Sequence, residues 1–154
     1  MNILIKNQQN YRSLNTAKIG KAARNVLSLL QQSEVELSIL FVGNKKMKQL
    51  NTAFRGIQKT TDVLSFNSEI PVKKLDYPQG NGLQRPVLGD IVISIPKAVS
   101  QARISGAGLY GEIYRLLIHG VLHLSGYNHE KSGHRAKVMR KKEQEILSAI
   151  KEMG

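Results

Sequence analysis

The sequence of 154 residues contains no cysteine and no tryptophan, and it has only four prolines. Without cysteine, neither a disulfide-stabilised scaffold nor a metal site built on thiolates is possible. No apolar run approaches the roughly 18 residues that span a bilayer, and the first ten residues lack the long apolar stretch of a secretory signal. Hydrophobic residues still make up 41% of the chain. We therefore expect a soluble cytoplasmic protein with one domain over residues 1–154.

Acidic residues are also scarce, with 11 against 23 lysines and arginines, which gives a formal net charge of +12. Residues 1–60 carry ten basic and two acidic side chains, whereas residues 61–129 are nearly balanced and residues 130–154 carry a net +3. A chain this basic favours a polyanionic partner, most often nucleic acid. The alternative is a basic surface that has no specific partner.

Hydrophobic periodicity and turn residues predict the order β-α-β-α-β-β-α-α-α. The expected strands lie at 3–5, 35–43, 62–66 and 87–94. The expected helices comprise one with an apolar stripe at 19–30 that Asn15 or Thr16 caps, a basic one that Asn44 caps and that ends at Arg55 and Gly56, and others at 96–105 and 109–125. A last helix has Ala136, Met139, Glu143, Ile146, Leu147 and Ile150 on one side. Residues 67–86 lack periodicity and read as a long loop. This order predicts an α+β fold with a small mixed sheet packed with helices.

Three of the four histidines fall within HGVLHLSGYNH, at 119–129. His119 and His123 are four residues apart and therefore share one face of a helix. Gly126 is placed to end that helix in a left-handed cap, so that His129 can fold back as a third ligand. This zincin-like spacing is that of the H-E-x-x-H-x-x-G-x-x-H metalloproteases. It predicts a metal site, with Zn²⁺ preferred and Ni²⁺, Cu²⁺ or Co²⁺ also compatible.

Gly120 occupies the position at which such a protease carries its glutamate base. Any water attacking a substrate must then be activated by the metal alone or by a group from elsewhere in the chain. A phosphodiester suits this site better than a peptide, since a cation and an arginine can offset charge on the phosphoryl oxygens. His134, the fourth histidine, reads as an exposed residue of the last helix.

The motif HGVLHLSGYNH resembles the H-G-x-L-H-L-x-G-Y-D-H signature of the YbeY family, which comprises metal-dependent single-strand endoribonucleases of ribosomal-RNA maturation. FRGIQKTTDVLSF at 54–66 and LGDIVIS at 88–94 are similar to two further blocks of that family, and Glu112 matches a glutamate common in its histidine-bearing helix. The resemblance extends from about residue 35 to 147. One departure is Asn128, where the family usually has aspartate, so a mechanism that needs an acid or base there is in doubt.

This resemblance implies that His119, His123 and His129 bind the metal and that Arg55 is the catalytic or phosphate-contacting residue. It also implies ribosomal RNA and the small ribosomal subunit as partners, together with the assembly GTPase Era. Several polar residues are weaker candidates, either for substrate binding or for contact with the ligands: Lys45, Lys46, Lys48, Asp62, Ser65, Asp90, Glu112 and Asn128. Turn capping explains the two aspartates slightly better, a salt bridge explains Glu112 equally well, and a solvated helix face explains the lysines.

The leading hypothesis is an endoribonuclease acting on small-subunit precursor RNA. A second hypothesis is a ribosome-assembly factor that binds RNA or protein and in which the metal is structural. A peptidase is disfavoured by Gly120, because its base would have to come from outside the histidine helix.

Overall fold

Four strands and five helices alternate along residues 2–32, 34–67, 87–127 and 133–153, which the computed structural model describes. Their bounds are β1 Asn2–Gln8, α1 Thr16–Leu29, β2 Glu36–Val42, α2 Asn44–Arg55, β3 Val63–Phe66, β4 Val87–Ser94, α3 Ile95–Ser105, α4 Gly108–Leu124 and α5 Gly133–Met153. The order predicted from the sequence is confirmed, although the first strand is longer than the expected 3–5.

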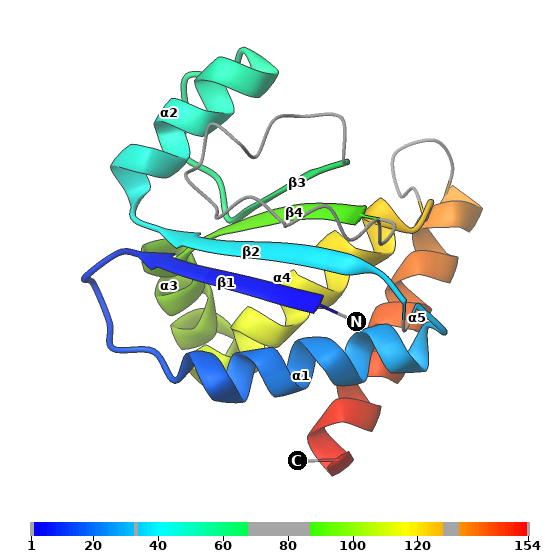
Figure 1. Ribbon diagram of the computed structural model, residues 1–154. Helices are drawn as coiled ribbons and strands as arrows, with labels where there is room; N and C mark the ends of the chain where they lie inside the picture. The colour runs from blue at the N-terminus through cyan, green and yellow to red at the C-terminus, as the bar shows by residue number, and fades with distance from the viewer. Residues whose placement is uncertain (1, 33, 68–86, 128–132, 154) are drawn as a thin grey trace.

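The strands form one mixed sheet in the order β1-β2-β4-β3 (Figure 1). Strands β1, β2 and β4 are parallel, and their connections pass through helices, as parallel neighbours require. The short strand β3 runs antiparallel to β4 at the sheet edge, with Ser65 opposite Ile91. The expected small mixed sheet is therefore confirmed, and β3 is the strand nearest to the histidine helix α4.

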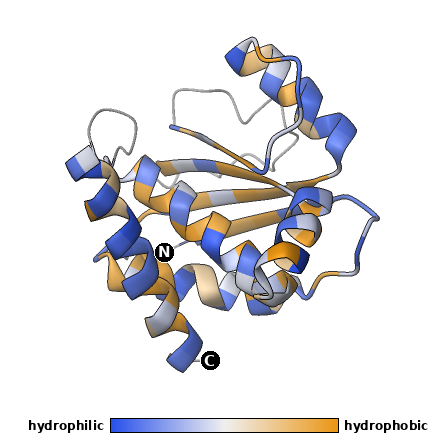
Figure 2. Ribbon diagram, turned by 180° about the vertical axis from the view of Figure 1, so that it is seen from behind, coloured by the Kyte–Doolittle hydropathy of each residue, from blue (hydrophilic) through white to orange (hydrophobic). Residues whose placement is uncertain are grey.

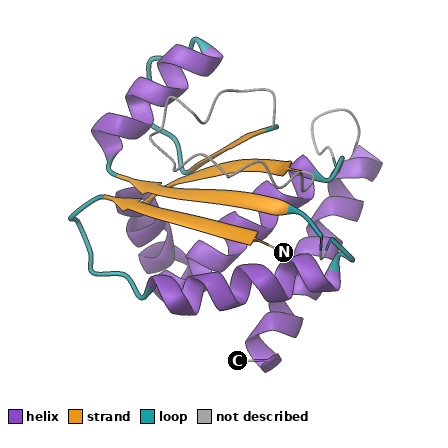
Figure 3. Cartoon of the chain, viewed as in Figure 1, coloured by secondary structure: helices purple, strands orange, loops and turns teal. Residues whose placement is uncertain are grey.

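Helices cover both faces of the sheet, but unequally (Figures 1 and 3). Helices α1, α3, α4 and α5 lie on one face and α2 lies on the other. Successive residues of β2 point to opposite faces: Leu37 and Ile39 enter the larger core under the four helices, whereas Leu40 enters the smaller core under α2. A strand buried on both faces is apolar without alternation, which explains the continuous hydrophobic run in the sequence.

The apolar sides of the helices turn toward the sheet and their polar sides turn outward (Figure 2). On α5 the buried positions are Met139, Ile146 and Ile150, which belong to the predicted stripe. None of the helices within the described residues combines the length and hydrophobicity needed to cross a membrane.

Local hydrogen bonds set the helix ends, and one of them corrects a prediction. The Asn15 side chain accepts a hydrogen bond from the Lys18 amide, as expected for an N-cap. Helix α2, however, is capped by Gly43, and Asn44 is its first residue. The Asn44 side chain instead accepts hydrogen bonds from Ser94 Oγ and Thr60 Oγ1, because α2 starts beside the end of β4. Gly126 has a φ of 101°, so the predicted left-handed residue after α4 is confirmed.

Gly89 marks an irregularity of β4 that only glycine permits. The register between β2 and β4 shifts between Glu36 and Leu37, opposite Gly89, whose φ is +149°. A Cβ there would lie 2.3 Å from the carbonyl oxygen of Phe66 and 2.9 Å from Cδ2 of Leu124. The bulge thus allows β3 and the end of α4 to approach β4 closely.

Candidate active site

The histidine pair of α4 lies at the wall of a cavity. His119 and His123 sit on successive turns of the helix, with ring centroids 6.1 Å apart and an interplanar angle of 51°. Both rings are only partly exposed. The four-residue spacing predicts this shared face, and the packing of α4 beside β3 turns that face toward the cavity.

The cavity has a volume of about 350 Å³ and joins three parts of the chain that are distant in sequence. Helix α4 forms one wall, β3 and the residues before it form another, and the C-terminal end of α2 closes it. Its lining residues are Arg55, Thr61, Asp62, Val63, Leu64, Ser65, His119, Gly120 and His123. The fold therefore brings together the basic residue and the two histidines that the sequence singles out.

Gly120 lies between the two histidines and packs on the sheet. A Cβ at this position would meet Cδ1, Cγ1 and Cγ2 of Ile91 at 3.0, 3.1 and 3.2 Å. Ile91 is fully buried in β4, so it cannot move aside into solvent. Gly120 is thus also a close-packing position, since a side chain there would require Ile91 or the helix to shift by a few tenths of an ångström.

Glu143 of α5 contacts the ring of His119 through Nδ1. Its Oε1 lies 2.5 Å from Nδ1 of His119, and the exposed fractions of the two side chains are 15% and 26%. A carboxylate accepts a hydrogen bond from Nδ1–H. This hydrogen bond fixes the tautomer and the ring orientation, and it leaves the lone pair on Nε2. Carboxylate–histidine pairs of this kind are typical of metal-binding histidines. The donor set therefore fits a transition metal.

The contact of Glu143 with His119 was not predicted from the sequence, which placed Glu143 on the apolar side of the last helix. The only signal was that an acidic residue stood among Met139, Ile146 and Ile150. His129 and Asn128 lie outside the described residues. Within the described parts of the chain, no three His, Cys, Asp or Glu side chains are grouped closely enough to hold a metal ion.

Arg55 is the last residue of α2 and is exposed at the cavity. Gly56 ends the helix with a φ of 69°, and its amide donates to the carbonyl oxygen of Thr52. This left-handed cap turns the chain so that the next residues run back along the cavity into β3. Arg55 and β3 thereby face the same space.

Asp62 lines the cavity and also builds the turn before β3. Its Oδ1 accepts a hydrogen bond of 2.7 Å from the amide of Val63, and its Oδ2 accepts one of 3.2 Å from Nε2 of Gln101. The backbone carbonyl of Asp62 accepts from the amide of Ser94. The capping role weighed for Asp62 is present, and its carboxylate is at the same time part of the cavity wall, as is Ser65.

Glu112 forms a bidentate ion pair with Arg115, at 2.9 Å to Nε and 2.6 Å to one terminal nitrogen. The carboxylate is buried, with 2% of the residue exposed. These hydrogen bonds raise the pKa of the Arg115 guanidinium, which also interacts with the charges of Asp62 and Glu143. Glu112 does not line the cavity; the salt bridge that was weighed as its alternative role is present, with Arg115.

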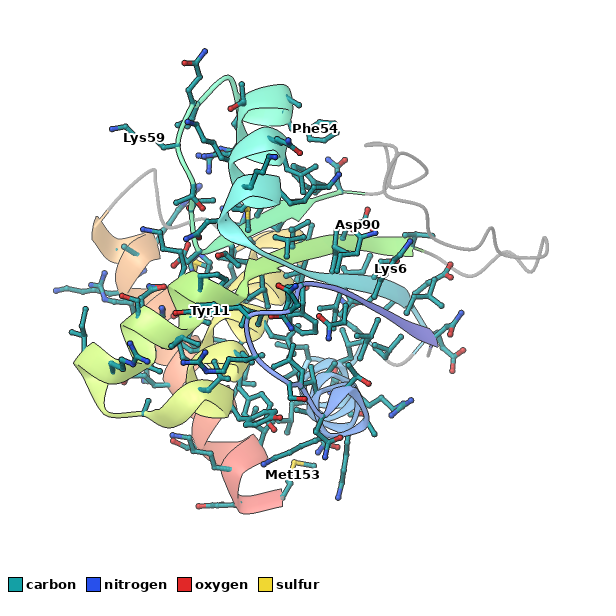
Figure 4. The ribbon with its side chains drawn as sticks, turned by 90° about the vertical axis from the view of Figure 1, so that its left-hand side faces the viewer. Lys6, Tyr11, Phe54, Lys59, Asp90 and Met153 are labelled. Carbon is teal, nitrogen blue, oxygen red and sulfur yellow. The ribbon has the colours of Figure 1, made fainter. Side chains whose placement is uncertain are left out.

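Asp90 lies on the face of the sheet opposite to His119 and His123, so the prediction that it contacts these two rings is wrong. Ile91 faces α4, so its neighbour Asp90 points to the opposite face of the sheet, the side of α2 (Figure 4). Only 2% of Asp90 is exposed, and burial raises the pKa of its carboxyl to about 7, although a hydrogen bond with Ser38 lowers it and Glu36 raises it further. The sequence could not assign this face, because β4 is apolar on both sides.

Lys45, Lys46 and Lys48 lie on the first two turns of α2, at the end opposite to Arg55. They do not line the histidine cavity. Lys45 and Lys48 are exposed and border a second cavity, described below. His134 is exposed near the start of α5, as expected.

Comparisons with known proteins show which family the chain resembles. The chain matches the family model described as Endoribonuclease YbeY over residues 4–151. A protein of Persephonella marina named Endoribonuclease YbeY is 39% identical over 149 residues, which cover 97% of this chain and 92% of the relative. A protein of the same name from Leptospira interrogans is 44% identical over 128 residues, covering 79% and 91%.

A Thermotoga maritima protein whose structure was determined in solution has a TM-score of 0.63 to this chain. The match covers 96% of this chain and 88% of that protein at 23% sequence identity. This likeness concerns the fold alone.

Proposed function

The chain belongs to the Endoribonuclease YbeY family, and from this premise we propose that it is a metal-dependent endoribonuclease whose active site is the cavity between α4 and β3. The observation that carries this proposal is the convergence of Arg55, His119 and His123 on one cavity of about 350 Å³. These three residues come from two helices that are far apart in sequence, and each has a chemical role in cleaving a phosphodiester.

His119, His123 and His129 are the proposed metal ligands, and Zn²⁺ is the preferred ion because three imidazoles leave a nitrogen-only site. When bound, such an ion supplies Lewis-acid stabilisation of developing charge and acidifies water. Support for this assignment comes from the contact between Glu143 and Nδ1 of His119. That contact leaves Nε2 as the nitrogen available to a ligand on the cavity side.

Arg55 is the proposed phosphate-binding residue. Its guanidinium can donate two parallel hydrogen bonds to the non-bridging oxygens of a phosphodiester and offset the charge that grows on them. The exposed position at the end of α2 lets the strand enter from solvent, while the histidine rings, partly buried, meet it inside the cavity. Gly120 cannot act as a base, so the attacking group must be activated by the metal or by a residue elsewhere in the chain.

The proposed substrate is single-stranded RNA, and specifically precursor RNA of the small ribosomal subunit in the cytoplasm. The ribosomal subunit and the GTPase Era are the proposed partners. The supporting observations are the net +8 of residues 1–60 and the family to which the chain belongs.

The test is cleavage of a single-stranded RNA by purified wild type and by the Arg55→Ala and His123→Ala variants, with zinc content measured in each. We expect Arg55→Ala to lower the rate by at least about 100-fold, as removal of one charge-stabilising donor does, while zinc content stays at the wild-type level. His123→Ala is expected to lose both cleavage and zinc.

Two residues provide matched controls. Arg103 is exposed in the last turn of α3, which also ends at a left-handed glycine, and His134 is an exposed histidine outside the cavity. Arg103→Ala and His134→Ala should cleave like the wild type. Unchanged cleavage in an Arg55→Ala, His123→Ala double variant would refute the proposal. A double variant that has lost cleavage but still restores ribosome maturation would instead favour an assembly factor that acts by binding.

A further inference from the structure

Four lysines surround a second cavity, of about 630 Å³, that adjoins the histidine cavity. Lys45 and Lys48 come from α2, Lys59 from the turn after α2, and Lys97 from the first turns of α3. Asn44, Gln58 and Thr60 also line it, and no carboxylate occurs among the described residues of the lining. Four like charges around one space repel one another unless an anion lies between them. This arrangement therefore has the character of a polyanion site.

Hydrogen bonds between the surrounding elements hold the walls of this lysine cavity in place. Asn44 Oδ1 accepts from Ser94 Oγ at 3.1 Å and from Thr60 Oγ1 at 3.3 Å, which joins α2 to the end of β4 and to the turn. The amide of Lys97 donates to Ser94 Oγ, and Asn51 Nδ2 donates to the carbonyl oxygen of Lys59. Ser94 and Asn51 are both buried. The backbones that carry the lysines are thus fixed relative to one another before a ligand binds.

The lysine cavity and the histidine cavity share one segment of chain. Lys59 and Thr60 line the first, and the next residues, Thr61 and Asp62, line the second. Lys59 extends outward from this segment (Figure 4). A chain molecule that has one phosphate beside Arg55 therefore has the lysine cavity within reach of its neighbouring phosphates. The two cavities are thus lined by consecutive residues of one segment.

We propose that the lysine cavity binds the phosphodiester backbone of the single-stranded RNA on one side of the bond that is cleaved. This inference rests on the proposed function. Lysine is a point-charge ligand of phosphate, and none of the lining residues that the structure describes has an aromatic ring on which a base could stack. The cavity accordingly holds the strand by its charge and not by its sequence.

An acidic protein segment fits this cavity less well. Protein interfaces derive most of their affinity from buried anchors, chiefly Trp, Tyr and Arg, that fill pockets lined by apolar residues. Among the described residues of the lining, the side chains are those of lysine, asparagine, glutamine and threonine. Contacts of this kind resemble those that proteins make with nucleic-acid backbones.

The test measures binding of a labelled 12-nucleotide, 2′-O-methyl RNA by fluorescence anisotropy over a range of salt concentrations, with a gel to verify that the strand stays intact. The variant is Lys48→Gln with Lys97→Gln. Each phosphate contact on a single strand contributes about 0.7 to the slope of log K against log salt. We expect the two substitutions to lower the magnitude of this slope by about 1.4. If the variant and the wild type bind equally at 1 M salt, the variant should then bind about 25-fold more weakly than the wild type at 0.1 M salt.

The matched control is Lys21→Gln with Lys141→Gln, which removes the same charge from exposed positions of α1 and α5. This control should change the slope by less than half as much. Lys48→Arg with Lys97→Arg keeps the charge and should keep the affinity. A dinucleotide, too short to reach both cavities, should bind the lysine variant as it binds the wild type.

Equal losses in the lysine variant and its control would overturn the proposal, because charge alone and not the cavity would then be responsible. Tighter binding of an acidic peptide than of RNA, lost in the same variant, would assign the cavity to a protein partner instead. Binding of a strand that is not cleaved is independent of catalysis. Failure of the wild type to cleave RNA would therefore refute the proposed function without changing the binding measurement. Unchanged binding by the lysine variant would refute the role of the lysine cavity without changing the cleavage measurement.

Discussion

Replacing Gly120 by alanine tests whether packing against β4 determines the residue between the two histidines. The new Cβ would lie 3.0, 3.1 and 3.2 Å from three carbons of Ile91. These contacts involve both branches of the isoleucine side chain. Rotation about Cβ–Cγ1 moves only Cδ1, and rotation about Cα–Cβ would move both branches within the packed core. Ile91 is fully buried, and the strain must be taken up by a shift of α4 or β4.

Two effects of opposite sign decide the outcome. Alanine is favoured over glycine inside a helix by about 1 kcal/mol. Overpacking of a well-packed core costs about 1 to 3 kcal/mol, and the three simultaneous contacts place this substitution in the upper half of that range. We therefore expect Gly120→Ala to lower the free energy of unfolding by about 1 to 2 kcal/mol.

The assay is urea unfolding at equilibrium, with Gly111→Ala as the matched control. Gly111 lies on the same helix, and a Cβ there would meet only the Ala107 side chain, at an ordinary 3.5 Å. The control should gain stability by up to about 1 kcal/mol. In an Ile91→Ala background the cost of Gly120→Ala should disappear, because the contacting atoms are gone. A Gly120→Ala protein as stable as the wild type would refute the packing argument.

Two further predictions concern one buried and one partly buried carboxylate. Burial raises the pKa of Asp90 from 3.8 to about 7, so the native state holds this proton more tightly than the unfolded state. The contribution of Asp90 to stability therefore declines as pH rises from about 4 to 7. Asp90→Asn should unfold like the wild type near pH 4 but be more stable at pH 8, by at most about 4 kcal/mol; equal urea midpoints at pH 8 would contradict this. Glu143→Ala should weaken zinc binding about 10- to 100-fold in a chelator competition, since the carboxylate orients His119. Glu145→Ala, which changes an exposed neighbour, should leave zinc binding unchanged. Equal zinc affinities of the two variants would show that Glu143 does not orient His119.

Periodicity and turn chemistry predicted the order of elements because both are local. The helix over His119 and His123 follows from its continuous apolar pattern, and the left-handed Gly126 follows from the preference of glycine for positive φ. Parallel pairing of β1, β2 and β4 is consistent with the helices that separate them. The one capping error, at Asn44, arose because its side chain is engaged by Ser94, 50 residues away.

The candidate site was only partly predictable. Spacing within one helix identifies the histidine pair, but the contact of Glu143 with His119 joins residues 24 apart in sequence. An acidic residue in an apolar stripe does not reveal its partner. Asp90 was misplaced because a strand buried on both faces has no alternation from which to assign a side.

The sequence by itself determined the basic character of residues 1–60, the chain order of strands and helices, and the common face of His119 and His123, since charge, periodicity and helix geometry are properties of neighbouring residues. Only the tertiary structure decided that Arg55 and the edge strand β3 share a cavity with that histidine face. It also showed that Gly120 is needed for the contact of α4 with Ile91. These relations depend on how the elements pack. Packing brings together residues that are far apart in the sequence, and no local pattern indicates such contacts.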